Sequence, residues 1–92
     1  MSENIVLAAI FNLALKNHQE NKLDVAQDLY NQVLKIDPNH LGAHNNLGVS
    51  FKALGENQKA KDCYEKAIEL KPDYAEALTN LGSTMVHRTV KT

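Results

Sequence analysis

The sequence predicts an all-α fold, a solenoid of about 2.5 helix–turn–helix repeats that contains five helices. Identical residues recur at an interval of 34 positions, as Pro38 and Pro72 do, and Tyr30 and Tyr64. Within each interval the apolar residues follow steps of three and four, which is the period of an amphipathic helix. No stretch alternates with the period of two that indicates a strand. The 92 residues are expected to form a single domain, because a chain of this length has room for one core.

The expected helices cover residues 3–18, 23–36, 40–54, 57–70 and 74–87. Asn21 follows the first helix and Gly55 follows the third, 34 residues later. Gly and Asn are the residues that most readily adopt the left-handed conformation that closes a helix. The second and fourth helices end before Pro38 and Pro72, because a residue that precedes proline disfavours helical backbone.

The third and fifth helices begin after each proline. Asn39 is the expected N-cap of the third helix, and Asp73 with Glu76 forms a D-x-x-E pattern that resembles a capping box. The fifth helix has no second helix to pair with, since its turn position falls at Thr89, near the end of the sequence. The tail Val86–Thr92 is a poor helix former and is expected to fray.

Composition excludes several function classes. Ten Lys and Arg against eleven Asp and Glu give a net charge of −1, without the basic stripe of a nucleic-acid binder. The longest apolar run, Ile5–Phe11, is far shorter than the roughly 20 residues of a membrane helix. The opening Ser2–Asn4 is acidic, unlike a secretory signal. The single cysteine, Cys63, allows no internal disulfide and suits a reducing compartment, so a soluble, cytoplasmic protein is expected.

The repeat resembles the tetratricopeptide repeat. The middle unit carries the pattern in Leu47, Gly48, Phe51, Gly55, Ala60, Tyr64, Ala67 and Pro72. The first unit has Asn17 where an aromatic residue belongs, and the third has Met85 there. The resemblance assigns repeat one to residues 7–40, repeat two to 41–74 and a partial repeat three to 75–92. It implies a right-handed superhelix whose concave groove binds proteins or peptides.

Small residues in this pattern also have a direct physical role. Gly48 and Gly82, with Ala14 one period before them, would let neighbouring helices approach closely. The rings of Phe51 and Tyr64 would fill the space between the helices.

The first helix of each repeat is expected to turn one leucine into the stack, namely Leu13, Leu47 and Leu81. The groove is then expected to contain Phe11, Asn12, Leu15, Asn45, Asn46, Val49, Lys52, Thr79, Asn80 and Ser83. Asn12, Asn46 and Asn80 recur once per repeat, and an Asn amide can both donate to and accept from the main chain of an extended peptide. They resemble the asparagine ladder of O-GlcNAc transferase-like repeat domains. The alternative is that these amides are only solvated or bond to a loop.

Related domains use Lys or Arg in their first and third repeats to hold the acidic C-termini of heat-shock chaperones. The corresponding positions here are Phe11 and Leu15 in repeat one and Glu76 and Asn80 in repeat three. A carboxylate would find no charge-assisted partner at these positions, so binding of chaperone tails is not expected.

Metal, cofactor and catalytic sites are not expected. His40 and His44 have the spacing of two metal ligands on a helix, but no third ligand accompanies them. Cys63 is interpreted as an inert, half-buried thiol. The sequence has no glycine-rich phosphate loop and no nucleophile elbow.

Two alternatives to a peptide-binding module stay open. One is self-association as a homodimer through uncovered terminal helices, with Leu81, Met85 and Val86 as the contact residues. The other is that the chain is the N-terminal repeat fragment of a larger transferase-type enzyme.

Overall fold

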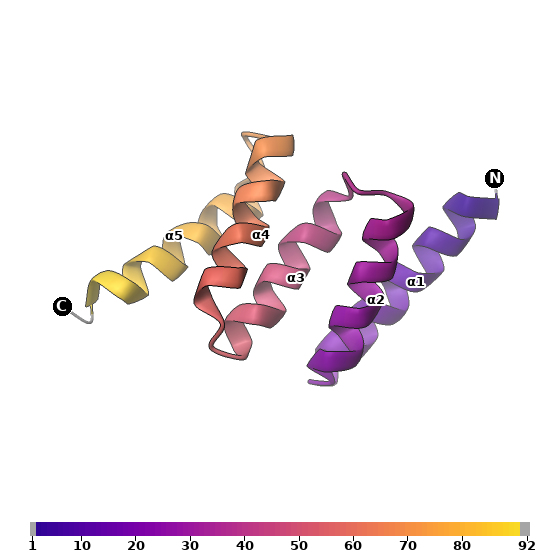
Figure 1. Ribbon diagram of the computed structural model, residues 1–92, viewed down its shortest axis with the longest axis horizontal. Helices are drawn as coiled ribbons and strands as arrows, with labels where there is room; N and C mark the ends of the chain where they lie inside the picture. The colour runs from indigo at the N-terminus through magenta and orange to yellow at the C-terminus, as the bar shows by residue number, and fades with distance from the viewer. Residues whose placement is uncertain (1, 91–92) are drawn as a thin grey trace.

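The computed structural model describes residues 2–90, with side chains from Asn4 to Thr84. This part of the chain contains five helices and no strand (Figure 1): α1 (Ser2–Gln19), α2 (Leu23–Ile36), α3 (Leu41–Ala53), α4 (Asn57–Leu70) and α5 (Ala75–Val90). The expected all-α fold is confirmed. The bounds of α2 and α4 are those expected from the sequence, and α5 continues past the expected end at residue 87.

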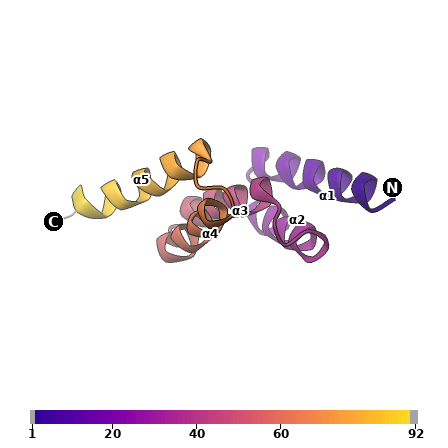
Figure 2. The same ribbon diagram turned by 90° about the horizontal axis from the view of Figure 1, so that it is seen from above.

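The helices form an elongated row of 49 × 28 × 17 Å. α1 packs against α2 and α3 against α4, while α2 also contacts α3 and α4 also contacts α5, so the pairs form a continuous stack. Figure 2 shows α1 and α5 rising on the same side, α3 between them, and α2 and α4 on the opposite side. The first helices of the repeats therefore share one face of the molecule.

The two turns within repeats have the geometry that the sequence predicts. Asn21 has φ 63° and Gly55 has φ 81°, both in the left-handed region. The residue after each turn donates its N–H to a carbonyl five residues earlier, at 2.8 Å for Lys22 and 2.9 Å for Glu56. This bond is typical of the Schellman motif, which satisfies carbonyls at the end of a helix.

The N-cap of α3 differs from the expectation. The Ala43 N–H donates to the Nδ1 of His40 at 3.0 Å, so His40 and not Asn39 caps the helix. The Asn39 N–H instead donates to the Asp37 carboxylate at 3.1 Å within the preceding turn. Asn39 lies one residue too early, because the tight turn after Pro38 uses it to reverse the chain.

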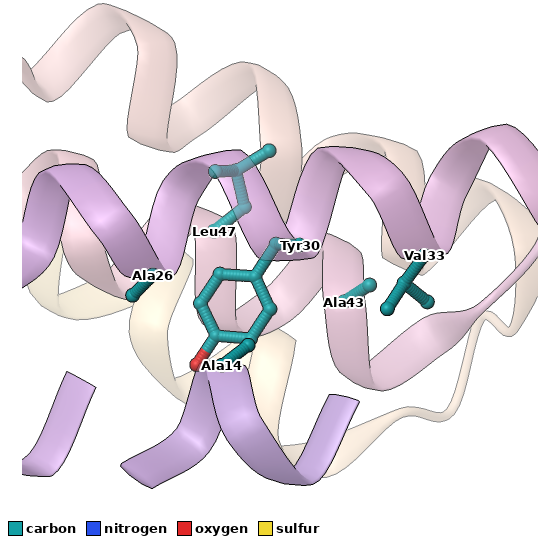
Figure 3. Close-up of a cluster of buried hydrophobic side chains, with 6 residues drawn as sticks. All are labelled: Ala14, Ala26, Tyr30, Val33, Ala43 and Leu47. Carbon is teal, nitrogen blue, oxygen red and sulfur yellow. The ribbon is translucent and has the colours of Figure 1, made fainter. Parts of the chain in front are cut away.

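The core lies where α1, α2 and α3 meet (Figure 3), and its buried side chains are Ala14, Ala26, Tyr30, Val33, Ala43 and Leu47. The fully buried Tyr30 ring lies on Ala14 of α1. The next repeat uses Gly48 and Tyr64 at the same positions, and a Cβ added at Gly48 would lie 2.6 Å from the Tyr64 ring. The expected close approach of helices at residue 48 is therefore confirmed. The close approach expected at Gly82 is not found, because an added Cβ would meet no atom of the described chain within 4 Å beyond its own helix turn.

Candidate functional site

The candidate site is the face shared by α1, α3 and α5, which we call the groove face. Six of the side chains expected there are half-buried: Phe11, Leu15, Asn46, Val49, Lys52 and Asn80. Asn12, Thr79 and Ser83 are exposed, and Asn45 is buried. The groove face therefore has apolar side chains mainly on α1 and polar side chains mainly on α3 and α5.

Phe11 connects α1 to α3 at the apolar end of the groove face. Its ring centroid lies 4.6 Å from that of His40 and 6.1 Å from that of Tyr30. Its Cζ lies 2.8 Å from the position of a Cβ added at Gly42, so any larger residue there would require the ring to shift. Sequence analysis did not single out Gly42. The repeat does offer a signal, because the equivalent positions hold Ala8 and Glu76, and glycine occurs there in repeat two alone.

Two side-chain hydrogen bonds connect α3 to α5 at the polar end. The Nδ2 of Asn80 donates to the Oδ1 of Asn45 at 3.0 Å, and the Nζ of Lys52 donates to the Oγ of Ser83 at 2.6 Å. Asn45 is only 3% exposed, so it belongs to the contact between helices and not to the open surface expected for it. A hollow of about 290 Å³ adjoins Asn80 and is lined by Ala75, Glu76, Thr79 and Asn80.

The three repeated asparagines are not equivalent. Asn80 uses its amide donor on Asn45, whereas the side chains of Asn12 and Asn46 make no hydrogen bond within the described part of the chain. Asn46 lies at the centre of the groove face and is half-buried, while Asn12 is exposed. Asn46 therefore has both its donor and its acceptor available at a half-buried position.

The expected burial of the three leucines is correct for one of them. Leu47 is 6% exposed, because it packs into the core formed with α2. Leu13 is 49% exposed, since no helix of the described chain lies on that side of α1. Leu81 is half-buried on α5, and its neighbour Leu78 is 45% exposed. The side chains of Met85 and Val86, the other expected self-association residues, lie outside the described residues.

The candidate metal and thiol groups have structural partners or buried surroundings. His40 accepts the capping hydrogen bond, and the Nε2 of His44 lies 2.8 Å from the carbonyl oxygen of Pro38. No group of three or more His, Cys, Asp or Glu side chains in the described residues is placed to hold a metal ion. Burial, with a smaller effect of Asp62, raises the pKa of Cys63 to about 11, so the thiol is protonated at neutral pH.

None of the described helices is both long and apolar enough to cross a membrane.

Sequence comparison finds three matching family models, each described as a tetratricopeptide repeat. They match residues 7–40, 42–74 and 63–88. A search of curated proteins finds no match.

Similar folds occur among solved structures. The crystal structure of MamA has a TM-score of 0.86 and 24% identity, covering 90% of this chain and 48% of MamA. The first and second TPR domains of Spaghetti (RPAP3), each bound to the HSP90 peptide SRMEEVD, have a TM-score of 0.84. Their identities are 24% and 16%, over 90% of this chain and 66% and 77% of theirs. The chain thus spans about half the length of the MamA structures, and the likeness at these identities is one of fold.

Proposed function

The chain belongs to the tetratricopeptide repeat family, and on that premise we propose that its groove face binds an extended segment of a partner protein. The coarser assignment, a protein-interaction module, is supported by the repeats themselves. A domain of the same fold, the second TPR of Spaghetti, is bound to a peptide. In this proposal residues 1–92 act as one non-catalytic domain, and the single cysteine favours a cytoplasmic location.

The amide of Asn46 is the observation on which the proposal rests. It is half-buried at the centre of the groove face, with no partner in the described chain. One peptide unit offers an N–H and a C=O, and an unbonded Asn amide matches both. Asn12 has the same amide at the repeat-one end, and Asn80 retains its carbonyl oxygen because only its Nδ2 is used. The peptide main chain is therefore the part of the ligand that these residues would recognise.

The rest of the groove face favours a ligand with an apolar side chain over an acidic tail. Phe11 and Leu15 present half-buried apolar surface in repeat one. Glu76 and Asn80 stand where related domains place cations in repeat three. Among the described side chains assigned to this face, Lys52 carries the positive charge, and Ser83 already accepts one of the hydrogen bonds of its ammonium. We therefore propose an extended peptide that places an apolar residue over Phe11 and Leu15.

Replacing Asn46 by alanine tests this proposal. Each lost hydrogen bond to a neutral peptide unit is expected to weaken binding roughly 2- to 13-fold. The probe is an extended peptide selected by the wild-type chain from a peptide array, and the measurement is isothermal titration calorimetry. Asn31→Ala, at an exposed position on α2, serves as the control and should bind as wild type does. Equal affinity for wild type and for the Asn12, Asn46 and Asn80 alanine variants would show that the ladder binds no peptide.

Self-association is a second candidate function, favoured by the surface of α1. Ile5, Val6 and Leu13 are 64%, 48% and 49% exposed, and they lie at the N-terminal end of the stack. An apolar stripe of this kind is typical of an interface. Size exclusion coupled to light scattering should show a homodimer at high micromolar concentration, and Leu13→Lys should convert it to a monomer. A wild-type monomer throughout that range contradicts this candidate.

A further inference from the structure

The imidazole of His40 has one ring nitrogen in use and one free. The backbone N–H of Ala43 donates to its Nδ1 at 3.0 Å, which is the capping bond of α3. Because a backbone N–H can only donate, Nδ1 holds no proton, and the proton of the neutral ring is on Nε2. Nε2 has no partner in the described chain, where the Tyr64 hydroxyl is the buried side-chain polar atom that lacks one. The Nε2–H of His40 is therefore a hydrogen-bond donor open to solvent.

This donor lies at the apolar end of the groove face, beside Phe11. The ring centroids of Phe11 and His40 are 4.6 Å apart, and the ring planes are tilted by 48°. Cε1 of His40, which is bonded to Nε2, lies 3.3 Å from the position of a Cβ added at Gly42. The capping bond and the Phe11 ring together orient the imidazole, so its donor has a set direction before a ligand binds.

The equivalent positions in the other repeats offer no such donor. The residues 34 positions before and after His40 are Val6 and Tyr74. Valine has no polar side-chain group. Burial, the charge of Glu76 and a hydrogen bond to Glu76 raise the pKa of Tyr74, so the Tyr74 hydroxyl already has a partner. Of the three positions, His40 alone therefore offers a free donor.

A single donor of this kind gives a bound segment a fixed position. Asn12 and Asn46 offer the same unbonded amide in successive repeats, so an extended main chain bound by these amides could shift by one repeat. We propose that the Nε2–H of His40 donates to a main-chain carbonyl oxygen of the bound segment, next to the apolar side chain over Phe11, and so sets the register of the segment along the groove face. This inference rests on the proposed function and adds to it the residue that places the segment lengthwise.

The acceptor is assigned to the peptide main chain because of charge. His40 is neutral while it caps α3, so its Nε2–H provides a hydrogen bond without a positive charge. A carboxylate is bound most strongly by a charged donor. A neutral carbonyl oxygen loses less hydration than a carboxylate does when it enters a site without a counter-charge.

Two substitutions of His40 separate the donor from the other roles of the ring. Serine is a favoured N-cap residue, so His40→Ser retains an acceptor for the Ala43 N–H but removes the ring and the donor. His40→Phe retains a ring beside Phe11 but removes the cap and the donor. Both variants should bind the peptide that the wild-type chain selects from the array roughly 2- to 13-fold more weakly, measured by isothermal titration calorimetry. His44→Phe is the control and should bind as wild type does, because Nε2 of His44 is already paired with the carbonyl of Pro38.

The two variants also differ in what their other losses predict. His40→Phe should unfold at lower urea concentration than His40→Ser, because it alone loses the cap. Weaker binding by His40→Phe alone would assign the effect to the cap, and weaker binding by His40→Ser alone would assign it to the ring. Either result overturns the inference. In the free wild-type chain, long-range proton–nitrogen NMR should show the ring proton on Nε2, and a proton on Nδ1 contradicts the inference as well.

The register is measured with the same peptide carrying a nitroxide at one end. On the wild-type chain, paramagnetic broadening of the amide signals should be confined to one end of the groove face. On His40→Ser and His40→Phe it should extend to the neighbouring repeat, because the bond that favours one position is missing. An unchanged pattern on both variants would remove the role of His40 in setting the register.

Failure of this inference differs from failure of the proposed function. If Asn46→Ala weakens binding of the peptide while both His40 variants bind as wild type does, the inference is overturned and the groove function stands. If the wild-type chain selects no peptide from the array, both are overturned. If high salt abolishes the difference between wild type and His40→Ser, the acceptor is a carboxylate and the main-chain assignment is wrong.

Discussion

Replacing Gly48 by alanine is expected to lower the free energy of unfolding by about 1–3 kcal/mol, the usual cost of overpacking a core. The new Cβ would lie 2.6 Å from Cε1 and 2.9 Å from Cδ1 of Tyr64. The Tyr64 ring is fully buried and has no free volume to move into. The clash must therefore be relieved by separating α3 from α4, which loosens the contact that holds repeat two together.

Gly82→Ala is the matched control, because it makes the same substitution at the equivalent residue of repeat three. No atom of the described chain beyond its own helix turn lies within 4 Å of the added Cβ. The variant should gain about 0.5–1 kcal/mol, since alanine restricts the unfolded chain and favours helix. Urea denaturation followed by circular dichroism measures both variants. Changes of the same sign would contradict the different surroundings of the two glycines.

Tyr64→Phe is expected to stabilise the protein, although it removes a polar group from the core. The Tyr64 hydroxyl is buried and has no hydrogen-bond partner in the described chain. A buried, unpartnered polar group costs roughly 1–3 kcal/mol, which phenylalanine removes while retaining the ring. Burial, with a smaller effect of Cys63, raises the pKa of Tyr64 to about 12, so the unpartnered hydroxyl is in its neutral form at neutral pH.

Tyr30→Phe should have the opposite effect. The Tyr30 hydroxyl lies 2.8 Å from Nδ1 of His18. Burial raises the pKa of Tyr30 to about 12 and lowers the pKa of His18, so burial favours the neutral form of both partners in this bond. Loss of this bond should cost about 0.5–1.5 kcal/mol. Thermal and urea denaturation of both phenylalanine variants should give changes of opposite sign, and destabilisation by Tyr64→Phe would indicate a partner for its hydroxyl.

The different surroundings of the two tyrosines follow from one substitution between the repeats. The position of His18 in repeat one is held by Lys52 in repeat two. The Lys52 ammonium bonds to Ser83 on α5, and the Tyr64 hydroxyl lacks the hydrogen-bond partner that Tyr30 has in His18. In repeat two, α5 lies beside α3, so the Lys52 side chain has a hydrogen-bond partner, Ser83, on the groove face.

Local features of the fold were predictable from the sequence, because they depend on residues close together in the chain. The left-handed turns at Asn21 and Gly55 follow from residue type alone, and the structure confirms them. Leu13 has the same repeat position as the buried Leu47, yet it is 49% exposed. The repeat could not predict this difference, because burial at this position depends on a helix packed on the outer side of the first helix, and the described chain has none beside α1. The cap at His40 was missed because histidine is not among the favoured N-cap residues.

The polar contacts of the groove face could not be predicted from the sequence. The bond between Asn45 and Asn80 joins residues 35 positions apart and depends on how far α5 tilts toward α3. The 34-residue interval gave Asn12, Asn46 and Asn80 the same expected role, but the Asn80 side chain donates to the buried amide of Asn45. Whether Asn12 and Asn46 bind a peptide stays a prediction.

The two ends of the groove face should differ in stiffness. Between α3 and α5, the bonds Asn45–Asn80 and Lys52–Ser83 are directional, and a change in helix tilt would stretch or bend both of them. Between α1 and α3, the Phe11 ring rests on Gly42 and His40 through contacts that tolerate sliding. On the groove face, the contacts between α1 and α3 are therefore expected to resist a change in helix tilt less than the two bonds between α3 and α5 do. A bound segment is then expected to change the curvature of the groove face more between α1 and α3 than between α3 and α5.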